Sequence, residues 1–281
     1  MSAVWFNGQF VDGTLPLDAH DRGLLLGDGV FETIAAVNHK PLWLDEHLQR
    51  MSQAASELGI VFDAKVLFAG LGTVLRKSEA QFEALRITLS RGKTSRSLAG
   101  DSASPSLLMT LDGFDAKNLF QPCRLKVSQV RRNEYAPSSR LKTLSYIDGI
   151  AAAREVSADA DDALMLNTHG HVASSTIANI FLLRGNELVT PSLNQGILPG
   201  VMRRVLLDNA KKLGSVPVEK TVSLEDLFRA DAVFLCNSLR FLRPVTELNG
   251  EPLGKRPLDH VKDGLGELAK KHCGVDPRTL M

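Results

Sequence analysis

The 281-residue chain has little of several features that mark specialised classes of protein. Its three cysteines, Cys123, Cys236 and Cys273, are too few and too scattered for a disulfide framework or a CxxC metal site. No apolar run approaches the roughly 20 residues that cross a bilayer, and the amino-terminal segment lacks the basic and apolar regions of a secretory signal. We therefore expect a soluble, cytoplasmic protein with reduced thiols, no metal and no membrane partner.

The chain also lacks an excess of charge of either sign. Its 33 lysines and arginines against 32 aspartates and glutamates give a net charge of +1, so no overall field favours nucleic acid or an anionic membrane. Hydrophobic residues at 44% and charged residues at 23% lie near globular averages, which excludes wholesale disorder, collagen and coiled coils. The length suits one large domain or two modest ones.

Hydrophobic periodicity and turn signals predict a mixed α+β chain. Asn7-Gly8 supplies the positive φ values of a type I′ turn between two strands, and a polar, turn-rich stretch marks a domain boundary. We place a small amino-terminal domain over residues 1–114, a linker over 115–121 and a larger domain over 122–281. The predicted strands cover 4–6, 9–11, 82–90, 106–112, 123–129, 162–166, 178–183, 187–190, 216–220 and 232–236; the predicted helices cover 45–58, 64–77, 146–156 and 200–213, with a solvated outer helix after Gly254.

Lys142 is the first candidate for chemistry. It lies between apolar residues, and Arg140 and the Arg131-Arg132 pair are its cationic neighbours in the sequence. Both features favour a neutral amine that attacks an aldehyde. An ordinary lysine is most often a solvated surface residue, so Lys142 alone does not establish a site.

Two glycine-containing segments add weaker signals. The segment 197–200 leads directly into a predicted helix, whose N–H groups and dipole can hold an anion, and Ser238 lies in a turn that could add a hydroxyl. The segment 21–32 carries three glycines and two charge pairs directly before a strand. A structural turn clamped by an Asp–Arg pair explains it equally well.

Taken together and in order, these segments resemble the class IV aminotransferases, the fold-type IV pyridoxal-phosphate enzymes. That family includes D-amino-acid and branched-chain transaminases and aminodeoxychorismate lyase. The resemblance implies a two-domain α+β fold with a small amino-terminal α/β domain and a larger, β-barrel-like carboxy-terminal one. It is carried by the Asn-Gly hairpin, Asp-Arg-Gly to Val-Phe-Glu at 21–32, His-Leu-Gln-Arg-Met at 47–51, Arg-Gly at 91–92, the lysine segment, Asn-Ile-Phe at 179–181, Gly-Ile-Leu-Pro-Gly-Val-Met-Arg at 196–203 and Arg-Pro-Val at 243–245.

The resemblance also implies a cofactor, pyridoxal 5′-phosphate, and a role for individual residues. Lys142 matches the Schiff-base lysine, which also moves the proton between substrate and cofactor. Arg50 matches the arginine that clamps the phosphate, and Glu32 is expected to orient its loop rather than take a proton. Further cofactor contacts are assigned to Tyr146, Ser174, Ile197, Leu198, Asn237 and Ser238, and substrate contacts to Phe31 and Arg96.

Three positions bear on which member of the family the chain resembles. Ser174 stands where the family carries a glutamate beside the ring nitrogen, and a hydroxyl stabilises a positive ring poorly, which implies slower transamination or a bias toward elimination. Arg96 matches the carboxylate-binding arginine of D-amino-acid transaminases, but the histidine expected two residues later is Leu98, so a basic surface turn is an equal alternative. The turn 236–239 is similar to that of aminodeoxychorismate lyases.

The sequence therefore supports three hypotheses. The first is a homodimeric transaminase that exchanges an amino group between an amino acid, either a D-amino acid or a branched-chain one, and a 2-oxo acid. The second is an aminodeoxychorismate lyase that eliminates pyruvate. The third is a vestigial protein that only binds the cofactor, although a chain that retains Lys142, Arg50 and the phosphate turn argues against it.

Overall fold

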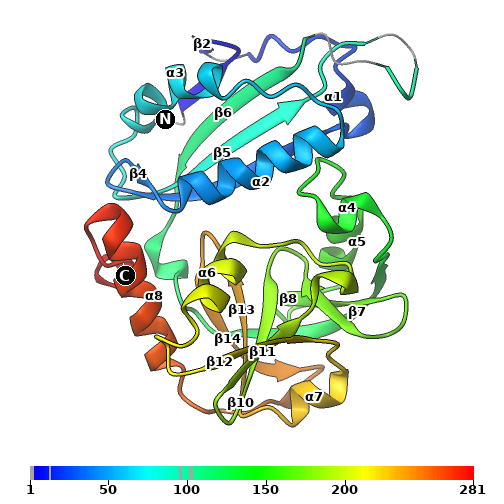
Figure 1. Ribbon diagram of the computed structural model, residues 1–281, viewed down its shortest axis with the longest axis vertical. Helices are drawn as coiled ribbons and strands as arrows, with labels where there is room; N and C mark the ends of the chain where they lie inside the picture. The colour runs from blue at the N-terminus through cyan, green and yellow to red at the C-terminus, as the bar shows by residue number, and fades with distance from the viewer. Residues whose placement is uncertain (1–2, 13, 95–96, 101–103) are drawn as a thin grey trace. The chain divides into compact units, whose positions relative to one another are not determined.

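The structure, a computed structural model, describes residues 3–12, 14–94, 97–100 and 104–281 and divides into two compact units (Figure 1). The first unit contains residues up to 116 together with 141–145 and 269–280, and the second contains 117–140 and 146–268. The segments 141–145 and 269–280 come from the region that the sequence assigns to a second domain. Among the described residues, no helix combines the length and the apolar character that a membrane span requires.

The first unit is built on a six-stranded antiparallel sheet in the order β2-β1-β6-β5-β3-β4. The hairpin between β1 and β2 has Asn7 at φ 44° and Gly8 at φ 99°, as its Asn-Gly turn predicts. Its strands are β1 (Ala3–Phe6), β2 (Gln9–Phe10), β3 (Gly29–Val37), β4 (Lys40–Pro41), β5 (Phe82–Ser90) and β6 (Ser106–Gly113).

Two helices, α2 (Leu44–Glu57) and α3 (Ala64–Leu75), pack on one face of this sheet, and Figure 1 shows α2 lying across the strands. Leu48, Met51 and Ala55 recur on the buried side of α2, as the helical spacing predicts. A short helix, α1 (Arg22–Leu26), precedes β3.

Side chains alternate between the two faces of the sheet. On β5, Leu85, Ile87 and Leu89 point to the helices and join the core, while Arg86 and Thr88 point to the opposite face. The same alternation on β3 separates Glu32, on the helix side, from Phe31. This division decides which residues of the first unit can act together.

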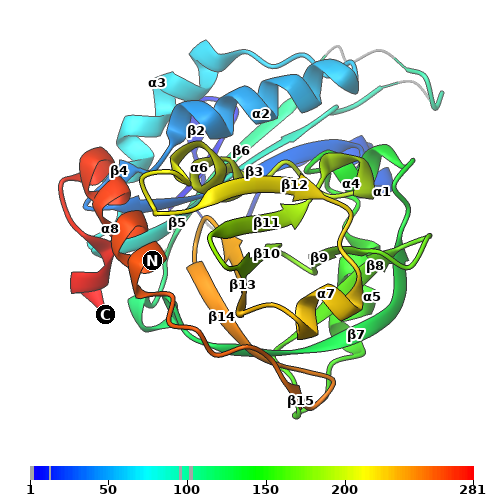
Figure 2. The same ribbon diagram turned by 60° about the horizontal axis from the view of Figure 1, so that its bottom comes forward.

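The second unit contains a nine-stranded sheet, in which six described strands close into a ring in the order β10-β13-β14-β7-β8-β9, with β9 pairing to β10 (Figure 2). Buried aliphatic residues such as Leu164, Ile180, Val233 and Leu235 fill its core. The ring confirms the barrel-like second domain. The strands are β7 (Cys123–Arg132), β8 (Asp162–Asn167), β9 (Val172–Ser175), β10 (Asn179–Arg184), β11 (Glu187–Pro191), β12 (Val216–Lys220), β13 (Ala232–Asn237), β14 (Phe241–Leu248) and β15 (Glu251–Pro252).

The helices of the second half differ from the expectations at their ends. The last helix, α8, buries Val261, Leu265, Ala269 and Cys273 along one stripe and exposes much of the rest, which agrees with the solvated helix packed on the outside that the sequence predicts. The helix predicted over 200–213 ends at Asn209. The helices are α4 (Pro137–Arg140), α5 (Ile147–Arg154), α6 (Val201–Asn209), α7 (Leu224–Phe228) and α8 (Asp259–Cys273), and the 3₁₀ turns are η1 (Ala116–Asn118), η2 (Leu193–Gln195) and η3 (Pro277–Leu280).

Candidate active site

Lys142 lies in an extended segment, 141–145, that runs along β3 in the first unit. The backbone N–H of Phe31 donates to the Lys142 carbonyl at 2.9 Å, and the N–H of Leu144 donates to the Gly29 carbonyl at 2.9 Å. Thr143 forms an antiparallel bridge with Val30, so Lys142 stands opposite Phe31. The Lys142 Nζ atom lies 4.4 Å from the centroid of the buried Phe31 ring.

Arg86 shares this aromatic ring. Its Cζ atom lies 3.8 Å from the Phe31 centroid, and its Nε donates to Thr88 Oγ1 at 3.2 Å. A guanidinium stacked on an aromatic face is a rigid, permanently charged group suited to a carboxylate. Sequence reasoning missed Arg86, although a signal was present: an arginine in the middle of an apolar strand, at a position that faces away from the core.

Glu32 organises the phosphate-clamp candidate, Arg50. Arg50 Nε donates to Glu32 Oε1 at 2.7 Å and its Nη2 donates to Oε2 at 2.6 Å, while His47 Nδ1 lies 2.7 Å from Oε2. His47 and Arg50 are three residues apart on α2 and therefore share one helix face. Glu32 thus orients Arg50 on the helix, where the sequence analysis expected it to orient its own loop.

Burial and hydrogen bonding shift the pKa values of Glu32 and His47. Burial opposes ionisation of Glu32, but the Arg50 charge and the hydrogen bonds from His47 and Arg50 outweigh it and lower the pKa of Glu32 to about 2. Burial lowers the pKa of His47 despite the attraction of Glu32. Because the ionised Glu32 carboxylate can only accept a hydrogen bond, the Nδ1 atom of His47 carries the hydrogen of this bond. A fixed ion pair between Glu32 and Arg50 results.

The glycine-rich segment 21–32 is held by side chains. Asp28 accepts hydrogen bonds from the Nε atoms of Arg22 and Arg91, each at 2.7 Å. Burial opposes the ionisation of Asp28, and the hydrogen bonds and charges of Arg91 and Arg22 still lower its pKa. A Cβ on Gly29 would lie 2.5 Å from a carbonyl oxygen of β5, so close packing requires the glycine. The segment is a structural clamp for the start of β3.

In the second unit, the turn 197–200 opens α6 without a side-chain cap. Gly200 is the N-cap residue, and the first turn of α6 has neither a capping hydrogen bond from a side chain nor an acidic residue. The next helix, α7, has a complete capping box between Ser223 and Asp226. An uncapped N-terminus leaves backbone N–H groups to bind an anion. The geometry is that of an anion cradle.

The other candidate residues of the second unit lie on different elements and have different hydrogen-bond partners. Ser174, on β9, is buried and donates its hydroxyl to the Ser175 carbonyl at 2.8 Å. Asn237 ends β13, and its Oδ1 accepts the N–H groups of the turn that contains Ser238. Tyr146 is the N-cap residue of α5.

The structure thus groups the candidates in two sets. The first unit brings Lys142 and Phe31 into contact and holds Arg50 through Glu32, the neighbour of Phe31 on β3. Arg96 lies outside the described residues. The second unit holds Tyr146, Ser174, Ile197, Leu198, Asn237 and Ser238. No group of three or more potential metal ligands of the His, Cys, Asp or Glu type occurs in the described part of the chain.

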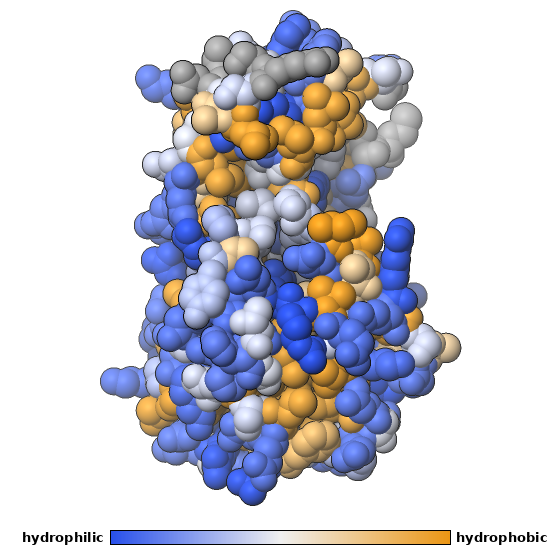
Figure 3. All heavy atoms as spheres, turned by 90° about the vertical axis from the view of Figure 1, so that its right-hand side faces the viewer, coloured by the Kyte–Doolittle hydropathy of each residue, from blue (hydrophilic) through white to orange (hydrophobic). Residues whose placement is uncertain are grey.

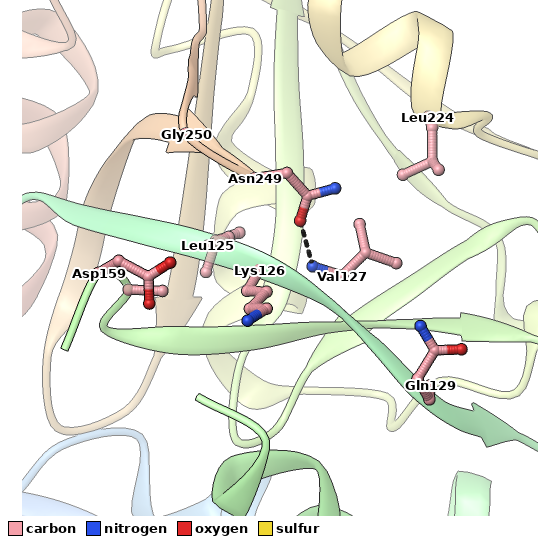
Figure 4. A pocket seen from close by; sticks show the side chains of 9 residues that line it. Leu125, Lys126, Val127, Gln129, Asp159, Leu224, Asn249 and Gly250 are labelled. Atoms are coloured by element: carbon pink, nitrogen blue, oxygen red, sulfur yellow. Dashed lines mark hydrogen bonds between the residues drawn. The ribbon is translucent and has the colours of Figure 1, made fainter. Parts of the chain in front are cut away.

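A separate pocket of about 450 Å³ opens on the second unit beside β7 (Figure 4). Asn249 lines this pocket, and its Oδ1 atom accepts a hydrogen bond from the Val127 N–H at 2.9 Å. Lys126 and Asp159 are the charged residues of the lining. None of the candidate site residues lines this pocket. It therefore has no part in the site described above.

Comparisons with known proteins agree with the resemblance. The family model for amino-transferase class IV matches residues 29–248. The chain is 29% identical to aminodeoxychorismate lyase of Bacillus subtilis, over 87% of this chain and 86% of that protein. It is 27% identical to a putative branched-chain-amino-acid aminotransferase of Methanocaldococcus jannaschii, over 95% of each chain. A crystal structure of a putative 4-amino-4-deoxychorismate lyase from Legionella pneumophila superposes with a TM-score of 0.84 at 31% identity, covering 91% of this chain and 96% of that one.

Proposed function

The chain belongs to the amino-transferase class IV family, and we propose that it is a pyridoxal-phosphate-dependent transaminase that moves an amino group from an amino acid to a 2-oxo acid. The observation that carries the proposal is the Lys142 amine, 4.4 Å from the centroid of a ring that also stacks on Arg86. An amine that can attack an aldehyde and an arginine that can pair with a carboxylate are the two groups that chemistry on an amino acid requires.

The residues fit the cofactor in two respects. The uncapped N-terminus of α6 suits a phosphate, and a Cβ on Gly200 would lie 2.0 Å from Asn179 Oδ1, so the turn has no room for a side chain there. Arg50 brings a guanidinium whose orientation is already fixed by Glu32. When bound, pyridoxal phosphate supplies an aldehyde for an amino group and a ring that withdraws electrons from the adjacent carbon.

The chain's own residues then divide the work. Lys142 would hold the cofactor through its side-chain amine, and the same amine would serve as the base and acid for the proton on the substrate α-carbon. Arg86 pairs with a substrate carboxylate, and Phe31 forms an apolar wall that excludes water from the Lys142 amine. In the second unit, the N–H groups after Leu198 would bind the phosphate, and Asn237, Ser238 and Tyr146 would add contacts to the cofactor. In the first unit, Arg50 is assigned to the phosphate by the family resemblance.

Elimination is the second candidate, and Ser174 favours it. The Ser174 hydroxyl donates to the Ser175 carbonyl, so its hydrogen is already used by the backbone. A protonated ring nitrogen would find no carboxylate at this position, which weakens the electron withdrawal that transamination needs in both of its half-reactions. The relatives named aminodeoxychorismate lyase point the same way.

A stoichiometry experiment separates the two reactions. The purified protein, loaded with pyridoxal phosphate, is mixed with one amino donor at a time in the absence of any 2-oxo acid. A transaminase releases one equivalent of oxo acid per subunit and stops until an acceptor is added. A lyase given aminodeoxychorismate releases pyruvate over many turnovers without an acceptor.

Lys142→Ala is the matched control for both outcomes. It should abolish either reaction and the covalent, borohydride-reducible link to the cofactor, while Lys77→Ala, at a surface lysine, should leave both intact. Full turnover by Lys142→Ala contradicts the assignment of the lysine. No release with any donor, from a protein that binds the cofactor, contradicts both enzymatic proposals and leaves the vestigial one.

We also propose that the enzyme is a homodimer. The short helix α1 exposes three consecutive leucines, Leu24, Leu25 and Leu26, at 62%, 58% and 53% of their surface. Figure 3 shows an apolar patch near the top of the face that is the right-hand side of Figure 1, the side on which α1 lies. Contiguous exposed apolar surface of this kind is typical of protein interfaces.

Sedimentation velocity tests this assembly. The variant Leu25→Glu/Leu26→Glu should sediment as a monomer at concentrations where the unmodified chain is a dimer. Phe228→Glu, at a single exposed aromatic residue on α7, should leave the dimer intact. A wild-type monomer at tens of micromolar contradicts the proposal.

A further inference from the structure

The anion cradle at the start of α6 is anchored by two buried amides that no part of the proposed mechanism uses. Asn167 ends β8 with 1% of its surface exposed, and Gln195 ends η2 with 8% exposed. Asn167 Nδ2 donates to Gln195 Oε1 at 3.0 Å. Burying two primary amides is unfavourable unless their polar atoms form hydrogen bonds. The hydrogen bond between Asn167 and Gln195 is therefore needed to keep both side chains buried.

The remaining polar atoms of the pair are also engaged. Asn167 Oδ1 accepts the N–H groups of His169 and His171 at 3.1 and 2.9 Å, which closes the turn between β8 and β9. Gln195 Nε2 donates to Asn194 Oδ1 at 2.8 Å. The amide pair therefore connects a fixed turn of the barrel to the residue directly before Gly196.

Gly196, the next residue after Gln195, packs closely against Glu134. It has a φ of 76°, and a Cβ there would lie 2.6 Å from Glu134 Cα. The Glu134 carboxylate accepts the Thr168 hydroxyl at 2.7 Å and the Thr168 N–H at 3.2 Å, within the turn that Asn167 closes. The start of the cradle is thus pressed against a segment that is itself bonded to the barrel.

The far end of the cradle is held independently. Asn179 Nδ2 donates to the Leu198 carbonyl at 3.0 Å. With Gln195 bonded on one side and Leu198 on the other, the backbone between them loses conformational freedom before any ligand arrives. Preorganisation of this kind raises affinity, because the cost of ordering the loop is removed from binding.

We propose that Gln195 and Asn167 are positioning residues for the phosphate group of the cofactor: their mutual hydrogen bond holds the turn 196–200 in the conformation that binds the anion. This inference rests on the proposed function, because it assigns the phosphate to the cradle of α6. It concerns the phosphate alone and not the aldehyde chemistry at Lys142.

The test compares two ligands that differ only in the phosphate. Protein stripped of cofactor is titrated with pyridoxal phosphate, with pyridoxal and with inorganic phosphate as a competitor. Gln195→Met, which keeps the size but removes the amide, should weaken pyridoxal phosphate binding at least tenfold and change pyridoxal binding less than twofold. Inorganic phosphate should lose its ability to compete.

A buried polar residue elsewhere in the barrel is the control. Ser128→Ala removes a hydroxyl, 1% exposed on β7, that accepts the Val130 N–H, and it should lower the melting temperature without changing the ratio of the two affinities. Gln195→Asn, which keeps the amide but shortens its reach, serves as the second variant if Gln195→Met does not fold. It should show the same loss of phosphate affinity to a smaller degree.

The outcomes separate the two proposals. Equal losses for pyridoxal phosphate and pyridoxal, or no loss for either, overturn the positioning role while the cofactor assignment stands. A wild-type protein that binds neither pyridoxal phosphate nor inorganic phosphate overturns the cofactor assignment and this inference together.

Discussion

Two glutamates of the first unit are buried completely on the same face of the same sheet, and they have opposite surroundings. Glu32 on β3 is bonded to Arg50 and His47. Glu83 on β5 has no hydrogen-bond partner for either oxygen within the described part of the chain. Among the ion pairs of the described residues, the one that includes Glu83 joins its Oε2 to His39 Nδ1 at 3.9 Å, and the His39 side chain is 44% exposed.

The difference shows what each position contributes. Glu32 faces α2, whose His47 and Arg50 reach it together from one helix face. Glu83 stands between Ala36 and Gly113, two residues without polar side chains. A buried carboxylate stabilises a fold only when donors surround it. Glu32 is therefore an anchor of the candidate site, and Glu83 is a polar residue that the first unit tolerates.

The largest effect should follow from breaking the bonded member of the pair. Glu32→Gln removes the charge that holds Arg50 and should lower the free energy of unfolding by about 3–5 kcal/mol, the range for removing one partner of a buried pair. Glu83→Gln, the same chemical change at equal burial, should alter it by less than about 1 kcal/mol. Urea denaturation measures the free energy of unfolding of both variants. Equal losses in the two variants would mean that Glu83 also has a stabilising partner.

The acid dependence of stability should report the ion pair of Glu32. Glu32 has a pKa of about 2 in the folded chain against 4.5 unfolded, so its contribution is complete above pH 4.5 and falls as the pH drops toward 2, by about 3 kcal/mol in all. The lowered pKa of His47 adds a loss that begins below its ordinary value, because the unfolded chain takes up the proton first. Unfolding free energies measured from pH 7 to 3 should fall steeply in the unmodified chain and less steeply in Glu32→Gln. Identical slopes contradict the ion pair.

An apolar replacement should have a smaller effect of the opposite sign. Glu83→Leu keeps a side chain of similar size in a position lined by the apolar core and removes two unpaired oxygens. It should raise the free energy of unfolding by about 1–3 kcal/mol, the usual cost of an unsatisfied buried group. Thermal melting detects the change, and a loss of stability would show that the carboxyl group has a function in the folded chain.

The comparison also marks the limit of sequence reasoning. The strand 82–90 and the hairpin at Asn7-Gly8 were predictable because alternation and turn chemistry are local. The strand β14 was missed because Pro244 stands inside it, and proline is rare within sheets.

The candidate site follows the same division. The resemblance supplied Lys142 and Arg50 from local motifs, but the bonds of Glu32 to α2 and the stacking of Arg86 on Phe31 join distant segments. Such contacts depend on how strands and helices pair in space. The roles of Glu32 and Arg86 therefore had to come from the structure.

The smallest predicted effect, that of His39→Asn on stability, tests whether Glu83 interacts with His39. His39 is the one residue that approaches its carboxylate within 4 Å among the described ion pairs, and it sits at φ 63° in the β3–β4 turn. His39→Asn removes that imidazole while suiting the left-handed backbone, which asparagine tolerates well. Because the 3.9 Å separation is too long for a hydrogen bond and the His39 side chain is 44% exposed, the variant should change the free energy of unfolding by less than about 0.5 kcal/mol, as an exposed substitution does. A loss of more than about 1 kcal/mol that disappears in the Glu83→Leu background would instead show that His39 and Glu83 are energetically coupled. Both glutamates would then have an ion-pair partner, and they would differ only in how far away that partner lies.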